Sequence, residues 1–366
     1  MKIKLLLLLN IVLINLMFSQ NQINKKSQAE KAGYSGPIKK VTQNCYKAKK
    51  KSGEIIPDTK IEDRTHLNFV VHYNINGNAT ESIYYEADGM FDYKITNEYD
   101  SLDNLRKSTV ASFFDQIKQT EFYTYDLTGN CIEYELKMFG DSLIASNNYE
   151  FDSNGYLIKE FNYRVKNVFG GIDVNSIETC NATMTYDKKG NMIEKHCRMN
   201  GELVGKFENL WVYDDKHQPI KRVRALREGN LYYEGTYSYP LDTLRRYDNI
   251  GNKTEENNGG EYVDTWVYDA KGNMIKENKG TNRISWKYDA QGNKIEEEST
   301  GYLFHRYLMQ YDNNGNLIAE QHYNFSKKIY YKAIYEYDRH GNCTKKIEYK
   351  KNRPKKITII KYEYYE

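Results

Sequence analysis

From about Leu67 onward, apolar and aromatic residues alternate with polar ones in short runs that are separated by turn residues. The clearest unit, residues 266–275, reads Trp-Val-Tyr-Asp-Ala-Lys-Gly-Asn-Met-Ile. Its Asp269 can accept hydrogen bonds from the turn backbone, and Gly272 can adopt the positive φ that closes a tight turn. The alternation on both sides predicts a β-hairpin with Tyr268 at the end of the incoming strand.

This unit recurs along the chain. More degenerate copies begin at Tyr73, Tyr99, Phe151 and Tyr213. The tyrosines from Tyr247 to Tyr337 are 20 to 26 residues apart, a spacing that fits two strands and two turns. Copies that keep Tyr-Asp-x-x-Gly-Asn have these predicted turn residues: Asp126 and Gly129, Asp187 and Gly190, Asp248 and Gly251, Asp269 and Gly272, Asp289 and Gly292, Asp312 and Gly315, Asp338 and Gly341.

The hairpin register depends on the loop length. A three-residue loop would place Ile275 opposite Val267, whereas a four-residue loop that begins at the aspartate places it opposite Trp266. We predict the second register, because it makes one face aromatic and aliphatic. It pairs Trp266 with Ile275, Trp286 with Ile295, Trp211 with Ile220, Tyr123 with Ile132, Tyr149 with Ile158 and Met184 with Ile193. The other face then holds Glu133, Lys159, Glu194, Lys276 and Glu296.

The same register places Cys180 directly opposite Cys197 in the hairpin that turns at Asp187. We therefore name this pair as a disulfide candidate, which would contribute about 3 kcal/mol for a loop of this size. Two unrelated buried thiols are the alternative, because the geometry of adjacent strands does not suit every disulfide.

The first nineteen residues are typical of a signal peptide. Lys2 and Lys4 precede an apolar run from Leu5 to Phe18 that is too short to span a bilayer, and Ser19 suits a cleavage site. We expect a signal peptide at 1–19, a basic segment with a degenerate strand at 20–60, and the repeat β-sheet domain at 61–366. The mature chain is then secreted, periplasmic or on the cell surface, with no transmembrane span.

Composition agrees with an exported β protein. The chain has 35 tyrosines and only 5 prolines, a balance that favours half-buried strands. The formal net charge is +3, and removal of Lys2 and Lys4 with the signal peptide would leave the mature chain nearly neutral. The sequence therefore gives no electrostatic reason to expect nucleic-acid binding.

No catalytic or cofactor motif emerges. The seven histidines are scattered, without the His-Glu-x-x-His spacing of a zinc protease, and the cysteine spacing is not that of a zinc site. Each aspartate turn supplies one carboxylate, whereas Ca²⁺ takes six to eight oxygen ligands, so turn capping is favoured over calcium. We expect no cofactor, no metal and no enzymatic activity.

The fold class that these hairpins predict is all-β: tandem antiparallel hairpins in a long coiled or partly closed spiralling sheet. A twisted sheet of this length does not stay flat, so it should coil or close upon itself with the aromatic face inside.

The Tyr-Asp-x-x-Gly-Asn-x-Ile copies resemble the YD repeats of the RHS family, which occurs in bacterial toxin shells and surface adhesion proteins. The resemblance implies a spiralling antiparallel sheet and an association with carbohydrate and cell-surface binding. The Asp-Pro-x-Gly signature of the toxin-shell core is absent, since none of the five prolines follows an aspartate. The sequence therefore resembles a short secreted YD-repeat protein without a toxin core or cargo domain.

Three classes of function stay open. The first is a scaffold that binds a glycan or surface protein, in which Trp211, Trp266 and Trp286 either stack on sugar or belong to the core. The second is a structural envelope protein or the remnant of a toxin-encapsulating shell. The third is a hydrolase that uses carboxylates such as Glu86 or Asp88. We predict the non-enzymatic scaffold.

Overall fold

The computed structural model describes residues 26–61, 68–112, 118–138, 142–165, 177–188, 190–199, 202–213, 219–227, 243–257, 262–301 and 304–366. These residues form one short helix, α2 (Gln28–Lys31), and 25 strands in a single sheet. The expected signal peptide at 1–19 lies outside this part of the chain.

The strands are β1 (Ile38–Lys51), β2 (Glu54–Lys60), β3 (Asn68–Tyr73), β4 (Ala79–Tyr85), β5 (Phe91–Tyr99), β6 (Leu105–Ser112), β7 (Lys118–Tyr125), β8 (Cys131–Met138), β9 (Ser142–Phe151), β10 (Leu157–Val165), β11 (Ile177–Tyr186), β12 (Met192–Met199), β13 (Glu202–Tyr213), β14 (Pro219–Arg227), β15 (Thr243–Tyr247), β16 (Lys253–Asn257), β17 (Val263–Tyr268), β18 (Met274–Lys279), β19 (Asn282–Tyr288), β20 (Lys294–Thr300), β21 (His305–Tyr311), β22 (Leu317–Tyr323), β23 (Ile329–Tyr337), β24 (Cys343–Lys350) and β25 (Arg353–Tyr364).

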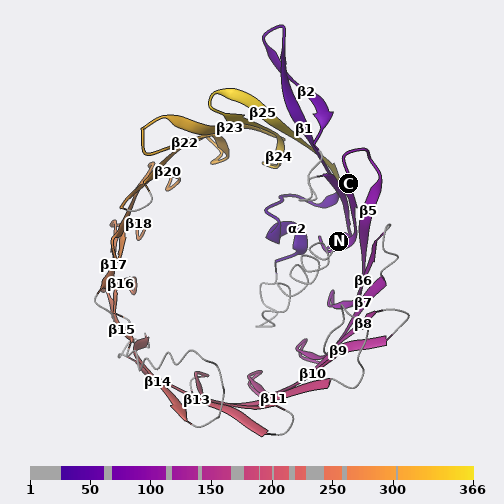
Figure 1. Ribbon diagram of the computed structural model, residues 1–366, viewed down its shortest axis with the longest axis vertical. Coiled ribbons are helices and arrows are strands. Elements are labelled where there is room, and N and C mark those ends of the chain that lie inside the picture. Colours follow the sequence, from indigo (N-terminus) through magenta and orange to yellow (C-terminus); the bar gives the residue numbers. More distant parts are fainter. Residues whose placement is uncertain are drawn as a thin grey trace.

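Consecutive strands from β3 to β25 pair antiparallel, which confirms the predicted all-β fold of tandem hairpins. The first half of β1 lies between β25 and β3, so the pairings return to where they begin and the strands surround an open centre (Figure 1). The second half of β1 pairs with β2, and this hairpin projects from the ring.

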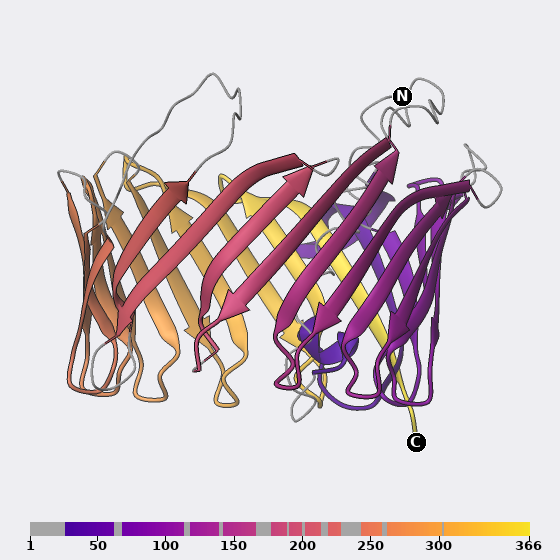
Figure 2. The same ribbon diagram turned by 90° about the horizontal axis from the view of Figure 1, so that it is seen from below.

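The antiparallel hairpins divide the ring into two edges, which the tilted strands join (Figure 2). One edge carries the Asp-x-x-Gly-Asn turns, such as those between β17 and β18 and between β19 and β20; we call it the aspartate rim. The opposite edge, the far rim, carries the turns between β22 and β23 and between β24 and β25.

The repeat turn contains three loop residues and a bulge. The Asp269 N–H donates to the Asn273 carbonyl at 2.9 Å, and the Gly272 N–H donates to the Asp269 carbonyl at 3.0 Å. Gly272 has a φ of +82°, as a type I turn followed by a left-handed residue requires. Tyr268 lies opposite Met274, but Val267 lies opposite Lys276, so Ile275 is an extra residue on its strand.

This bulge makes the predicted register wrong. The partners are displaced by two residues, an even number, so each side chain keeps its predicted face while its neighbour across the strands changes. The observed pairs are Trp266 with Glu277, Trp286 with Glu297, Trp211 with Arg222, Tyr123 with Tyr134, Tyr149 with Glu160 and Met184 with Lys195. At the Trp266 and Trp286 pairs, the face expected to be aromatic and aliphatic is therefore aromatic and charged, whereas Tyr123 has an aromatic partner.

The cysteine prediction is wrong for the same reason. Cys180 lies opposite Met199 and Cys197 lies opposite Ala182, and neither thiol is in a disulfide. The two cysteines are thus diagonal neighbours across adjacent strands. Such positions are about 7 to 8 Å apart, farther than a disulfide allows.

The N-terminal segment packs inside the ring. Ala29 of α2 is buried against Val41, Val71 and Tyr73, and α2 lies within the open centre in Figure 1. The segment also reaches the C-terminal repeat, because the Ser35 N–H donates to Asn342 Oδ1 at 2.7 Å. These contacts identify the face of the sheet that holds Val41 and Val71 as the inner face.

Candidate functional site

The turn aspartates bind their own backbone. In the Asp269 turn, Oδ1 accepts 2.9 Å bonds from the N–H groups of Lys271 and Asn273, and Oδ2 accepts from the Asn273 side chain at 3.0 Å. The Asn273 bonds lower the pKa of Asp269. The same bond to the asparagine N–H four residues on recurs at Asp126, Asp187, Asp248, Asp289, Asp312 and Asp338. The recurring Asp, Gly and Asn therefore act on the turn.

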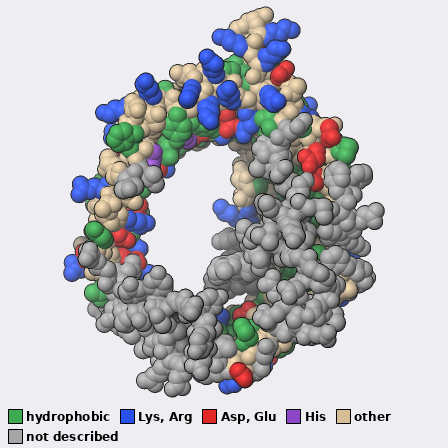
Figure 3. All heavy atoms as spheres, in the orientation of Figure 1, with side chains coloured by type: hydrophobic (Ala, Val, Ile, Leu, Met, Phe, Trp, Pro, Cys, Tyr) green, Lys and Arg blue, Asp and Glu red, His purple; other side chains and the backbone are tan. Residues whose placement is uncertain are grey.

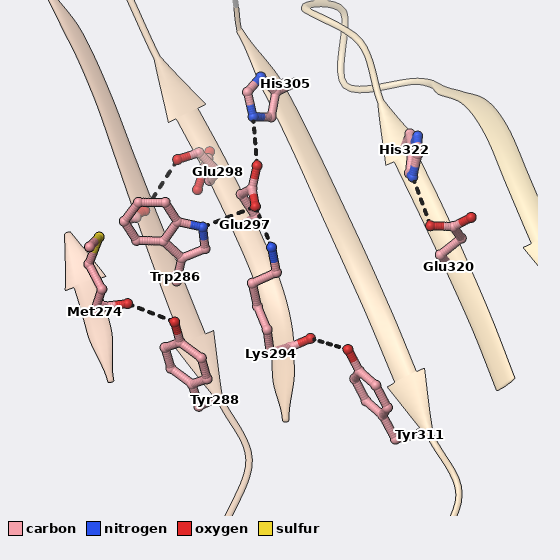
Figure 4. Close-up of polar contacts among 11 residues, drawn as sticks. Met274, Trp286, Tyr288, Lys294, Glu297, Glu298, His305, Tyr311, Glu320 and His322 are labelled. Carbon is pink, nitrogen blue, oxygen red and sulfur yellow. Dashed lines mark hydrogen bonds and ion pairs between the residues drawn. The ribbon is translucent and has the colours of Figure 1, made fainter. Parts of the chain in front are cut away.

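The recurring tyrosine joins one repeat to the next. The Tyr288 hydroxyl donates to the Met274 carbonyl at 2.8 Å, and Tyr311 donates to the Lys294 carbonyl at 3.0 Å (Figure 4). Each acceptor is the residue opposite the preceding tyrosine, next to the bulge. Equivalent bonds join Tyr99 to Ala79, Tyr125 to Leu105, Tyr186 to Leu157, Tyr268 to Lys253, Tyr337 to Leu317 and Tyr362 to Cys343.

The inner face of β19 to β24 holds side chains suited to ligand chemistry. Directly opposite residues share a face of the sheet, as do alternate residues of one strand. Val41 lies on the inner face and is opposite Tyr362 of β25. Following such residues from β25 across β24, β23, β22, β21 and β20 shows that Glu297 and its partner Trp286 also lie on the inner face. Figure 3 shows acidic and basic side chains along this inner wall.

Glu297 is the centre of one cluster (Figure 4). Its carboxylate accepts from the Trp286 indole N–H at 3.0 Å and from Lys294 Nζ at 2.6 Å, and it lies 3.2 Å from His305 Nε2. Burial acts to raise the pKa of Glu297, but the bonds from Lys294 and Trp286 outweigh it and the net shift is downward. The carboxylate is therefore ionised and fixed in place at neutral pH.

Four rings continue along the wall beside this cluster. The ring centroids are 4.6 Å apart from His305 to Tyr307, 4.2 Å from Tyr307 to His322 and 4.7 Å from His322 to Tyr331. We call these four residues the inner aromatic row. Glu320 borders it, with a 3.2 Å contact to His322 Nε2 and a 2.5 Å bond from the Tyr335 hydroxyl. The row and the neighbouring Glu297 and Glu320 thus offer ring surface, carboxylate oxygens and imidazole nitrogens within one patch.

The tryptophans singled out from the sequence differ in their surroundings. Trp266 is 7% exposed, its indole N–H donates to Glu277 at 2.8 Å, and Lys253 Nζ lies 4.0 Å from its ring centroid. Its ring is thus covered. Trp286 is half-buried in the Glu297 cluster, and the side chain of Trp211 lies outside the described residues.

The carboxylates considered for hydrolysis lie elsewhere. Glu86 and Asp88 belong to the turn between β4 and β5 on the far rim, where Asp88 Oδ1 accepts from the Met90 N–H at 2.8 Å. Across the described ranges, no group of three or more His, Cys, Asp or Glu side chains is arranged to hold a metal ion. In the same ranges no helix has the length and apolar character of a membrane span.

No family model and no curated protein matches the chain. Among solved structures, TcdB2-TccC3 without its hypervariable C-terminal region is 13% identical with a TM-score of 0.43, over 87% of this chain. This chain spans only 18% of that one. A porin-like protein from Bacteroides uniformis is 11% identical with a TM-score of 0.22, over 90% of this chain and 99% of the other. Likeness at this level assigns neither family nor function.

The inner glutamates are the site residues that sequence reasoning missed. The spacing of eleven residues from Trp266 to Glu277 recurs from Trp286 to Glu297, and it could have indicated them. The wrong register hid this signal, because it placed isoleucine opposite each tryptophan.

Proposed function

We propose that the chain is an exported, non-enzymatic β-scaffold that binds a carbohydrate on the inner aromatic row. The observation that supports this most is the run of His305, Tyr307, His322 and Tyr331 beside Glu297 and Glu320. Export follows from the signal-like segment at 1–19, and the carbohydrate class agrees with the resemblance to YD repeats.

The chemistry of this patch suits a sugar. Aromatic faces can pack against the C–H face of a pyranose, while ionised carboxylates accept hydrogen bonds from its hydroxyls. The carboxylates are already oriented by Lys294, Trp286 and Tyr335, so little side-chain entropy is lost on binding. A rigid wall of strands also holds the rings in fixed positions.

A glycan array with matched variants tests the proposal. We expect the purified chain to bind one sugar class saturably, and Tyr307→Ser with His322→Gln to lose at least tenfold in affinity. Phe161→Ser is the control, because Phe161 is 37% exposed on the outer face, next to the inward Glu160. Circular dichroism verifies that each variant is folded.

Equal loss in the control and the inner variants would refute the site. If the chain binds no glycan, a carbohydrate ligand is excluded, and a surface protein as partner or a structural envelope role is favoured. The pairing of β1 with both β25 and β3 suits such a structural role as well, since it leaves neither β3 nor β25 as an unpaired edge.

A further inference from the structure

Positive charge is concentrated where the first and last strands of the sheet meet. Residues 38–60 hold seven lysines against two acidic residues, and residues 327–366 hold twelve lysines and arginines against five, although the whole chain has a net charge of only +3. The pairing of β1 with β25 brings these segments together. Figure 3 shows the resulting group of basic side chains over one sector of the ring, where Figure 1 labels β1, β2, β23 and β25.

Part of this charge lies on adjacent turns of the far rim. The turn between β22 and β23 carries Lys327 and Lys328. Lys350 ends β24, Lys351 lies in the turn that follows, and Arg353 begins β25; all five side chains are exposed. The Lys351 N–H donates to the Tyr330 carbonyl of β23 at 3.2 Å, so the second turn begins beside the strand that follows the first. Among the described residues these five cations form no ion pair, unlike Lys345 and Lys356 on the same strands.

An aromatic side chain stands among these cations. Phe325 is 82% exposed in the turn before Lys327, and its ring meets that of Phe304 from the next far-rim turn, with centroids 6.0 Å apart. Transfer of such an exposed apolar side chain from water into an apolar phase lowers the free energy. Phe325, Lys327, Lys328, Lys350, Lys351 and Arg353 together form what we call the basic rim patch.

We infer that the basic rim patch docks the ring on an anionic lipid bilayer, with Phe325 entering the interface and the cations contacting lipid phosphates. The exposed tip of the β1–β2 hairpin, with Lys49, Lys50 and Lys51, adds charge to the same sector. Charge complementarity selects the anionic surface. The phenylalanine favours lipid over a soluble polyanion, since it has no polar group to pair with one.

Vesicle co-sedimentation tests this inference. We expect the purified chain to bind vesicles of phosphatidylcholine with phosphatidylglycerol, and to bind pure phosphatidylcholine weakly. Lys328→Gln, Lys350→Gln and Lys351→Gln together should weaken binding by about 100-fold, since each cation near the surface contributes about fivefold. Phe325→Ser should weaken it by about tenfold.

Two matched controls separate the patch from general surface effects. Leu127→Ser removes an apolar side chain that is 103% exposed on the aspartate rim, and Lys188→Gln, Lys271→Gln and Lys276→Gln remove three exposed charges elsewhere. Both controls should bind like the parent chain. Glycan binding on the inner wall should stay unchanged in all of these variants, so failure here is distinguishable from failure of the proposed function.

Several outcomes would overturn the inference. Equal binding to neutral and anionic vesicles would do so, as would an equal loss in the control variants. Binding to a soluble acidic polysaccharide without binding to vesicles would replace the bilayer with a polyanion. If Phe325→Ser bound like the parent chain, the inference that the Phe325 side chain enters the bilayer would be wrong.

Discussion

The hydroxyl of Tyr288 donates a 2.8 Å hydrogen bond to the carbonyl of Met274, the residue opposite the tyrosine of the preceding repeat. The bulge at Ile275 leaves this carbonyl next to an irregular part of the ladder, and the next tyrosine satisfies it. The hydroxyl of the repeat tyrosine therefore contributes to the structure, as does its ring.

Removal of that hydroxyl should loosen the contact between repeats. We expect Tyr288→Phe to lower the free energy of unfolding by about 1 kcal/mol, because the ring remains while one half-buried acceptor loses its donor. Urea denaturation measures the change. Tyr262→Phe is the control, because Tyr262 is 60% exposed and precedes β17. An effect no larger than that of the control would show that the bond contributes nothing.

The turn glycine should be replaceable only by residues that tolerate positive φ. We expect Gly272→Ala to cost about 1 kcal/mol of stability, since a Cβ there would meet no atom within 4 Å and only backbone strain at φ +82° remains. Gly272→Asn should cost less, because Asp103 occupies the same turn position with a φ of +60°. Thermal unfolding ranks the variants, and equal loss for both would contradict the conformational explanation.

The tyrosines that join repeats should titrate late. Burial raises the pKa of Tyr337 to about 12, whereas an unfolded tyrosine titrates near 10. Because the folded pKa is the higher one, this stability is fully present below pH ~10 and is lost as the pH rises through about 12. Tyr337→Phe should flatten the loss of stability above pH ~10, as ultraviolet titration and chemical unfolding at alkaline pH would measure. A parallel curve for parent and variant would exclude this linkage.

Glu297 should contribute stability that acid removes. Its pKa is lowered in the folded state by Lys294 and Trp286 against the effect of burial, so its contribution is present above the unfolded pKa of about 4.3 and falls as the pH drops through the folded value. We expect Glu297→Gln to cost about 1 to 2 kcal/mol near pH 7 and much less near pH 3. Glu336→Gln, at an outer pair with Lys345, should have a small effect at either pH. A difference that does not vary with pH would argue against the ion pair.

Glu121 should show the opposite dependence. It is 4% exposed, and burial raises its pKa even though Tyr123 and Gln119 hydrogen-bond to its carboxylate. When the pKa of an acid is higher in the folded state, its protonated form stabilises the fold at low pH relative to its ionised form. This stabilisation is lost as the pH rises through the folded pKa. Glu121→Gln should therefore be more stable than the parent chain near pH 8 and similar to it near pH 4, as paired denaturation curves would reveal. Destabilisation by Glu121→Gln at both pH values would count against this reasoning.

The hairpins and their faces could be predicted from the sequence, whereas the partners across the strands could not. The Asp269 turn was predictable because an aspartate, a glycine and an asparagine within five residues form the same bonds in any copy. The bulge at Ile275 was not predictable from alternation, because it shifts partners by two residues and leaves every face unchanged. For that reason the Glu297 cluster and the separation of Cys180 from Cys197 became visible only in the structure.

The turns, the strands and the side of the sheet on which each residue lies could all be derived from local sequence. These depend on interactions within about ten residues, which repeat wherever the motif repeats. Only in the folded chain does β1 pair with β25, does Ser35 form a hydrogen bond with Asn342, and do the lysines of the first and last strands share one sector. Such contacts join residues about 300 positions apart, and only the accumulated twist and curvature of the whole sheet determines where its ends meet.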